Sequence, residues 1–307
     1  MLPKKLILIN RQCPGDILML TAAVRDLHET FPDIEIGVHT RFPWLWENNP
    51  YIKPYLLGYN NHQNPENNPE RVDIGYKTPH QTGKHPAREH FIYAFHESLE
   101  QKFGIKLKRG IPYPDIHLSE DDTPIITDAQ KPLLLINAGS KPDFPIKQWI
   151  LPYFQEVVDR LQDKYTVVQI GESVTAHHTR LKNVRSMVDL TFGRDIVRLM
   201  RQASAVITGV SFPMHLCAAL NAADHQQRKC VVLAGHREDP AWEAYPDQNY
   251  LQKPCNCVSE GCGCWNRYLP PLIAPKPETC SNAIKLDSKW YARCIADITP
   301  EDVLRCL

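Results

Sequence analysis

Closely spaced cysteines are the strongest chemical feature of the sequence. Four of them fall within ten residues, at Cys255, Cys257, Cys262 and Cys264, and glycines between them permit sharp turns. Four thiolates suit tetrahedral Zn²⁺ or iron, and a set without an open coordination position has a structural role. Two later cysteines are alternate ligands, Cys280 and Cys294. The alternative is that these cysteines are free or paired in disulfides. Disulfides are the less expected state, because the sequence shows no export signal.

A carboxylate marks a second place where chemistry is expected. Pro14, Gly15 and Asp16 stand at the end of the first predicted strand and open a helix. Ligands of open α/β sheets bind at this position, so a carboxylate here is expected to face the cleft. Asp is also a common capping residue, so the alternative is that Asp16 only caps the helix.

Two turns after strands could bind phosphate. Residues 137–140 read Asn-Ala-Gly-Ser and precede a loop that contains Lys147. Small residues let the backbone approach an anion, and a Lys ammonium supplies a point charge. Residues 208–215 form a second turn, in which amide groups at a helix start, Ser211 and His215 could meet the same phosphates. The alternatives are an ordinary turn with a solvated lysine and a histidine with a structural role.

A third segment, residues 236–246, follows the strand ending at Leu233, where a nucleotide base or sugar would lie. Arg237 could pair with phosphate, and Trp242 could stack on a ring. Alternatively, Trp242 and Tyr245 pack a helix against the core.

The elements that position these residues predict an α/β protein. In the first part, residues 6–9 form a strand, a helix carries Val24, Leu27 and Phe31 on one face, and residues 35–38 form a strand. Residues 60–81 are rich in Asn, Pro, His and charge, which predicts a long loop near an active-site cleft or an insert. A helix over about 86–103 ends at Gly104, and the domain boundary is expected near residue 125.

The second part repeats the same alternation. Strands are predicted at 133–136, 166–170, 205–207 and 230–233, and helices at 152–161, 195–203 and 214–220. Thr299 and Pro300 then start a terminal helix, which is expected to cross back to the first domain. We therefore predict two Rossmann-like domains, residues 1–125 and 126–290, followed by a C-terminal segment, residues 291–307.

Charge and hydropathy restrict the function. The chain has 307 residues, with 35 Lys and Arg balancing 35 Asp and Glu, so no global field indicates a nucleic-acid partner. No apolar run approaches the roughly 20 residues that span a bilayer, and the start is too short for a signal peptide. We expect a cytoplasmic protein.

Taken in order, these segments resemble glycosyltransferase family 9, the heptosyltransferase family. The resemblance rests on Gly15 and Asp16, on Lys147 and Trp149 after the 137–140 turn, and on the segments 21–23, 169–172, 189–191 and 213–219. It covers nearly the whole chain, which makes it far more specific than any single motif.

The resemblance implies a GT-B fold, with two Rossmann-like domains facing a cleft. The N-terminal domain would bind the acceptor, a saccharide, lipid-saccharide or protein, and the C-terminal domain a nucleotide sugar, with ADP-linked donors favoured. Transfer would invert the anomeric centre without a catalytic metal, and Asp16 would be the base. Lys147 and the 208–215 turn would neutralise the leaving diphosphate. The implied donor-binding residues are Lys147, Ser140, Glu172, Ser211, Met214, His215 and Arg237.

One triplet departs from the family pattern. Where the family usually has Asp-Ser/Thr-Gly, this sequence has Val210, Ser211 and Phe212, and a side chain in place of Gly hinders close approach to phosphate. The alternative function is therefore a catalytically silent GT-B-like binding protein or a metal-stabilised assembly protein. Peripheral membrane contact and homo-oligomers are compatible with either function.

Overall fold

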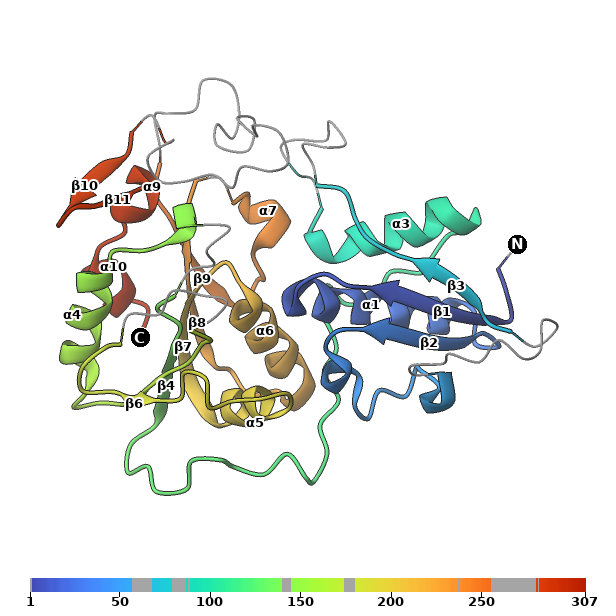
Figure 1. The fold of residues 1–307 in the computed structure, drawn as a ribbon, viewed down its shortest axis with the longest axis horizontal. Coiled ribbons are helices and arrows are strands. Elements are labelled where there is room, and N and C mark those ends of the chain that lie inside the picture. The colour runs from blue at the N-terminus through green and yellow to red at the C-terminus, as the bar shows by residue number, and fades with distance from the viewer. Residues whose placement is uncertain are drawn as a thin grey trace.

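The structure is a computed structural model that describes residues 2–56, 68–78, 87, 89–139, 145–173, 180–236, 238–254, 280 and 282–307. The described residues form two parallel sheets and a two-stranded hairpin. Figure 1 shows the two sheets in separate lobes, which lie side by side. We call the part from β1 to α3 the first lobe, and the part from β4 to α10 the second lobe.

The first lobe is built on a parallel sheet of order β2-β1-β3. Its strands are β1 (Lys5–Asn10), β2 (Glu35–Thr40) and β3 (Glu70–Asp73). β1 is the central strand, and its apolar residues are buried, as expected of a strand covered on both faces. The helical elements of this lobe are α1 (Pro14–Thr30), η1 (Pro43–Trp46), η2 (Pro54–Leu56), η4 (Phe91–Tyr93) and α3 (Ala94–Phe103).

β3 lies in the stretch for which the sequence predicts a long loop. Of its four residues only Val72 is buried, so neither apolar periodicity nor hydrophobicity indicates a strand. β3 forms because its backbone pairs in parallel with β1, where Leu8 faces Val72 and Ile9 faces Asp73. As an edge strand it needs only one apolar side chain in the core, and the predicted loop is wrong at these four residues.

The second lobe contains a six-stranded parallel sheet of order β6-β5-β4-β7-β8-β9. The strands are β4 (Leu133–Ile136), β5 (Thr166–Gln169), β6 (Arg185–Ser186), β7 (Ala203–Gly209), β8 (Lys229–Ala234) and β9 (Gln248–Gln252). Alternate residues of β4 enter different cores, Leu133 and Leu135 on one face and Leu134 and Ile136 on the other. The predicted α/β class and the repeated strand-helix alternation are confirmed.

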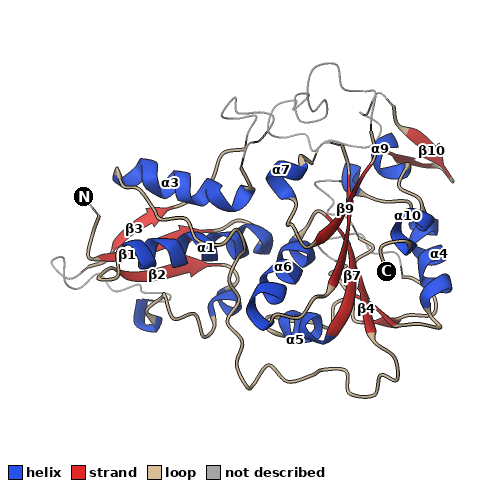
Figure 2. Ribbon diagram, turned by 180° about the vertical axis from the view of Figure 1, so that it is seen from behind, coloured by secondary structure: helices blue, strands red, loops and turns tan. Residues whose placement is uncertain are grey.

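Helices cover both faces of this sheet (Figure 2). On the face toward the first lobe lie α5 (Asp195–Gln202) and α6 (Phe212–Asp224), and on the far face lies α4 (Leu151–Leu161). α1 packs directly against α6, so it is enclosed by its own sheet on one side and by the second lobe on the other. This enclosure explains why almost every residue of α1 from Gly15 to Leu27 is buried.

The C-terminal segment stays with the second lobe. It comprises β10 (Ile284–Leu286), β11 (Lys289–Tyr291), α9 (Arg293–Ala296) and α10 (Pro300–Leu304). The Trp149 indole nitrogen donates to the Ile298 carbonyl at 2.8 Å, and Val303 and Leu307 are buried in the core that contains α4. Thr299 caps α10 as predicted. The expected return to the first domain is wrong, because the apolar side of α10 is already covered by α4.

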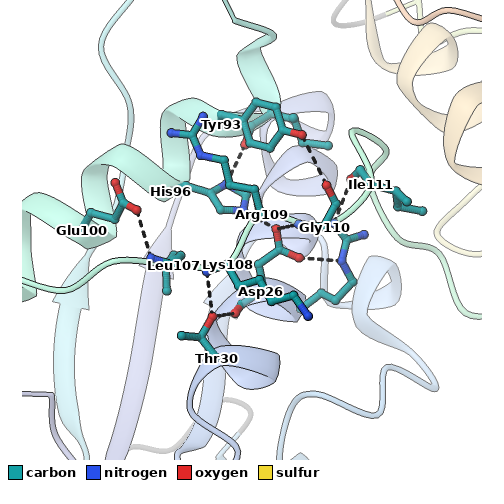
Figure 3. A network of polar contacts seen from close by, with 12 residues as sticks. Asp26, Thr30, Tyr93, His96, Glu100, Leu107, Lys108, Arg109, Gly110 and Ile111 are labelled. Carbon is teal, nitrogen blue, oxygen red and sulfur yellow. Dashed lines mark hydrogen bonds and ion pairs between the residues drawn. The ribbon is translucent and has the colours of Figure 1, made fainter.

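A buried polar network fixes the chain after α3 to α1 (Figure 3). Asp26 Oδ2 accepts hydrogen bonds from His96 Nε2 at 2.7 Å and from the Gly110 amide at 2.8 Å, and Oδ1 accepts from Arg25 Nε at 2.8 Å. Burial raises the pKa of Asp26, but these three donors outweigh it and lower the pKa below its ordinary value. His96 Nδ1 lies 3.1 Å from the Ile92 carbonyl oxygen, so the ring has a hydrogen-bonding partner at each nitrogen.

Candidate active site

The starts of α1 and α6 meet between the lobes. α1 follows β1 and α6 follows β7, so both helices begin at the carboxyl end of a parallel strand, where ligands of such sheets bind. The contact is close at Gly15, where an added Cβ would lie 3.2 Å from His215 Cδ2. A side chain here would require the imidazole to shift by a few tenths of an ångström, and the two motifs predicted to act together are adjacent.

Asp16 is half-buried at the N-terminus of α1, and each of its carboxylate oxygens accepts a hydrogen bond. Oδ2 accepts from the Cys13 amide at 3.0 Å, which is the capping contact that the sequence offered as one interpretation. Oδ1 accepts from the Tyr76 hydroxyl at 2.8 Å. The capping role and a position at the junction of the lobes are thus compatible, and the two contacts fix the plane of the carboxylate.

Tyr76 is a residue that sequence reasoning missed. Burial, followed by the negative charge of Asp16, raises the pKa of the Tyr76 phenol far above its ordinary value. The hydroxyl therefore stays protonated and acts as a donor at any accessible pH. Tyr76 lies just after β3, in the stretch predicted as a loop, so only the backbone pairing of β3 could have located it.

Lys147 lies at the end of η5 (Pro145–Lys147), next to the turn before α6. Its Nζ is 2.8 Å from Glu238 Oε1 and donates to the Val210 carbonyl at 3.4 Å. The structure thus brings together Lys147 and the 208–215 turn, as the sequence predicts. The Glu238 side chain is buried, with 1% exposure, and its charge holds the ammonium beside the turn. Sequence spacing gave no indication of Glu238.

The turn before α6 gathers hydroxyl groups at a helix N-terminus. Thr208 Oγ1 and Ser211 Oγ lie 3.0 Å apart, and Ser211 is the N-terminal capping residue without a side-chain bond to the helix. Val210 is buried in the core, and the Phe212 ring packs edge-on against Trp44 of the first lobe at 5.9 Å. The two departures from the family triplet therefore serve packing between the lobes.

His215 is buried and links the lobes. Its Nδ1 lies 3.0 Å from the Tyr245 hydroxyl, which is 2.8 Å from Met19 Sδ on α1. Burial, then the neighbouring His90 and Lys147, lower the pKa of His215 to about 3, so the imidazole is neutral near pH 7. A neutral imidazole can donate or accept a hydrogen bond without adding charge to the site.

The other predicted donor residues have different surroundings. Met214 is fully buried in the core, so its side chain packs under the turn. Glu172 is exposed just after β5, at the same edge of the sheet. Ser140 and Arg237 lie outside the described residues. Trp242, on α7 (Pro240–Glu243), stacks on Phe91 at 5.3 Å, as the packing interpretation predicts.

The cysteine hairpin, Cys255, Cys257, Cys262 and Cys264, also lies outside the described residues. Cys280 and Cys294 are described, with 9% and 3% exposure, and both belong to the core that contains α4. Among the described residues, no three or more His, Cys, Asp or Glu side chains gather as metal ligands would. None of the helices in the described part is both long and apolar enough to cross a bilayer.

Comparison with known sequences identifies one domain. Residues 75–224 match the family model of glycosyltransferase family 9 (heptosyltransferase). This range includes Lys147, Ser211 and His215 but begins after Asp16. No curated protein matches the sequence.

Comparison with solved structures gives the fold of both lobes. The Escherichia coli ADP-heptose LPS heptosyltransferase II is 16% identical with a TM-score of 0.61, over 98% of this chain and 97% of that one. A family 9 glycosyltransferase from Veillonella parvula is 16% identical with a TM-score of 0.58, over 80% and 84%. The dodecameric iron-containing heptosyltransferase TibC, in complex with ADP-D-β-D-heptose, is 15% identical with a TM-score of 0.67, over 99% and 74%. TibC comes from enterotoxigenic E. coli. At these identities the likeness establishes the fold, and the predicted GT-B architecture is confirmed.

Proposed function

We propose that this chain is a glycosyltransferase that uses a nucleotide sugar, because residues 75–224 match the family model of glycosyltransferase family 9. It transfers a heptose or similar sugar, with inversion, from an ADP-linked donor. The acceptor is a saccharide, lipid-saccharide or protein. Residues 1–125 bind the acceptor and residues 126–290 bind the donor. The observation that carries this proposal is the meeting of Asp16, Lys147 and the start of α6 between the lobes.

Asp16 is the proposed base. The Asp16 carboxylate takes the proton of the acceptor hydroxyl as that oxygen attacks the anomeric carbon, and the bond to the nucleoside diphosphate breaks with its electrons leaving on the phosphate oxygen. Such a positioned base contributes roughly 10²–10⁴-fold in rate. The orientation of Asp16 by its two donors supports this role.

The leaving diphosphate is proposed to bind at Lys147 and the start of α6. The ammonium group supplies positive charge, and the first amides of a 13-residue helix add donors and a favourable dipole. The Ser211 hydroxyl and the neutral His215 imidazole are hydrogen-bonding partners, and Ser140, Glu172 and Arg237 are the further donor-binding candidates. Glu238 keeps Lys147 at this position before a donor arrives.

A catalytically silent binding protein is the second candidate, and a specific observation favours it. Val210 and Phe212 occupy space in the core and against Trp44, where the family pattern has a carboxylate and a glycine. Turnover of a nucleotide sugar distinguishes the two candidates.

The decisive experiment is calorimetric titration with ADP-, UDP-, GDP- and CMP-linked sugars, combined with product detection. We expect one donor to bind, with Lys147→Ala weakening it about tenfold or more, which corresponds to about 1.4 kcal/mol. Asp16→Ala should retain donor binding and lose turnover. Lys106→Ala is the matched control, because Lys106 is highly exposed and pairs with Glu100 away from the site. If the folded protein binds none of these donors, the transferase proposal fails and the silent binding protein is supported.

A structural Zn²⁺ or iron site in the cytoplasmic protein is also proposed. Thiolates of the cysteine hairpin would hold it, with Cys280 and Cys294 as alternates, and the burial of both alternates in one core fits a closed site. The iron and the dodecameric assembly of TibC support a metal and an oligomer as properties to test. Elemental analysis of two paired variants, Cys262→Ser/Cys264→Ser and Cys280→Ser/Cys294→Ser, shows which cysteines are needed to bind the metal. Measurement of the particle mass with and without chelator tests whether the metal links an oligomer. Vesicle flotation tests peripheral membrane contact.

A further inference from the structure

The hydroxyl group of Tyr76 and the carboxylate of Asp16 form a hydrogen-bonded pair next to the junction of the lobes. Tyr76 donates to Asp16 Oδ1 at 2.8 Å, while the Cys13 amide donates to Oδ2 at 3.0 Å. One donor thus comes from the helix that carries Asp16, and the other comes from a segment sixty positions further along the chain.

In the part of the chain that the structure describes, the hydrogen bond and ring contacts of Tyr76 are to residues of the first lobe. The segment before it continues the pairing with β1, where the Ile74 amide donates to the Ile9 carbonyl at 2.9 Å and Asn10 Nδ2 donates to the Ile74 carbonyl at 3.1 Å. The Tyr76 ring packs on Phe91 with centroids 4.2 Å apart. The Tyr76–Asp16 hydrogen bond therefore joins two segments of the first lobe.

The charges around the pair favour a neutral phenol. Cys13 and Glu243 act on Tyr76 in the same direction as Asp16, so each opposes loss of the phenolic proton. The nearby imidazoles of His90 and His215 both have pKa values lowered by burial, to about 4 and about 3, and are uncharged at neutral pH. A hydrogen bond to an ionised carboxylate stabilises that form over the protonated one.

We propose that Tyr76 is a positioning residue for the base: its hydroxyl orients the Asp16 carboxylate and keeps it ionised, ready to receive the acceptor proton. This inference rests on the proposed role of Asp16. A carboxylate oxygen has two lone pairs, so Oδ1 can accept from Tyr76 and from the acceptor hydroxyl together. Tyr76 itself exchanges no proton with the substrate.

Tyr76→Phe is the test, because it removes the hydroxyl and retains the ring that packs on Phe91. The first readout is a ¹³C titration of the Asp16 carboxyl group, assigned by the loss of its resonance in Asp16→Asn. In Tyr76→Phe the midpoint should move to higher pH. The second readout is turnover: kcat should fall about tenfold, the value of one hydrogen bond to a charged group, with KM for the donor nearly unchanged. The acid limb of the pH profile should move to higher pH.

Tyr93→Phe is the matched control, because its hydroxyl contacts the carbonyl of Gly110 at 3.4 Å, and the amide of Gly110 binds Asp26, not Asp16. It should change neither readout. If Tyr76→Phe is folded and Asp16 titrates at the wild-type midpoint, the proposal is overturned. A shifted midpoint in a protein that turns over no nucleotide sugar would support the coupling of the two residues and overturn the transferase proposal instead.

Discussion

Replacing Asp26 by Asn should destabilise the first lobe strongly. Asp26 is completely buried and accepts from His96, Arg25 and the Gly110 amide. Asn offers one acceptor oxygen in place of two. If that oxygen takes the place of Oδ2, the new NH₂ group faces Arg25 Nε, and the opposite orientation loses two bonds. Either way a buried donor meets a donor, and the buried Arg25 guanidinium loses one of its two carboxylate partners, the other being Asp115.

Removing one partner of a buried ion pair typically costs about 3–5 kcal/mol, because the remaining charge stays desolvated. For a chain of this size about 1 kcal/mol corresponds to roughly 2–4 °C, so the thermal midpoint of Asp26→Asn should fall by about 10 °C at pH 7. Since the pKa of Asp26 is lowered in the native state, its contribution exists above the ordinary value of 3.8 and is lost as the pH falls through the native pKa. The difference between the two proteins should therefore shrink in acid.

The assay is urea unfolding followed by far-ultraviolet circular dichroism at pH 7 and at pH 3. Asp128→Asn is the matched control, because Asp128 pairs with Arg185 at the surface, with 72% exposure, and should unfold at the wild-type midpoint. An Asp26→Asn midpoint equal to the wild type at pH 7 would refute the argument that this network holds the lobe together.

Two further variants test individual contacts. Burial raises the pKa of Asp115 to about 6 despite the nearby Arg25 guanidinium. The wild type should therefore lose stability relative to Asp115→Asn as the pH rises from about 4 to 6. If the difference in urea midpoint between the two proteins is the same at pH 4 and pH 7.5, this prediction is wrong. Gly15→Ala places a methyl group 3.2 Å from His215 Cδ2 and should cost about 1–3 kcal/mol by overpacking, offset in part by the helix preference of Ala. Its control is Gly75→Ala, whose Cβ would only meet Gln12 Oε1 at 3.9 Å, and equal thermal midpoints for the two would count against the close approach of α1 and α6.

Buried apolar strands were predictable, and polar edge strands were not. β4 has the predicted bounds, 133–136, because Leu-Leu-Leu-Ile has to be covered on both faces. β3 and β9 are polar, and their backbones join sheets whose central strands provide the pattern. Backbone pairing of this kind leaves no periodicity in the sequence, so both strands were missed.

The residues of the candidate site also fall into those that could be predicted from the sequence and those that could not. Asp16 and Lys147 were found because each follows a strand or a turn of recognisable chemistry. Their partners Tyr76 and Glu238 are 60 and 91 positions away along the chain, and only the fold brings them together. Likewise, the charge of Asp26 suggests an exposed residue until the distant His96 reaches it.

The enclosure of α1 between the two lobes has a consequence for synthesis. α1 is complete at Thr30, whereas the helix that covers its outer side, α6, ends only at Asp224. At roughly 5–20 residues per second, a ribosome needs on the order of ten seconds or more to deliver it. Through that interval the nascent chain presents an apolar helical surface without its partner, and such a surface invites chaperones or aggregation. The N-terminal half therefore cannot finish folding until α6 has been synthesised. Shortened chains that end before α6 should need a chaperone to remain in solution.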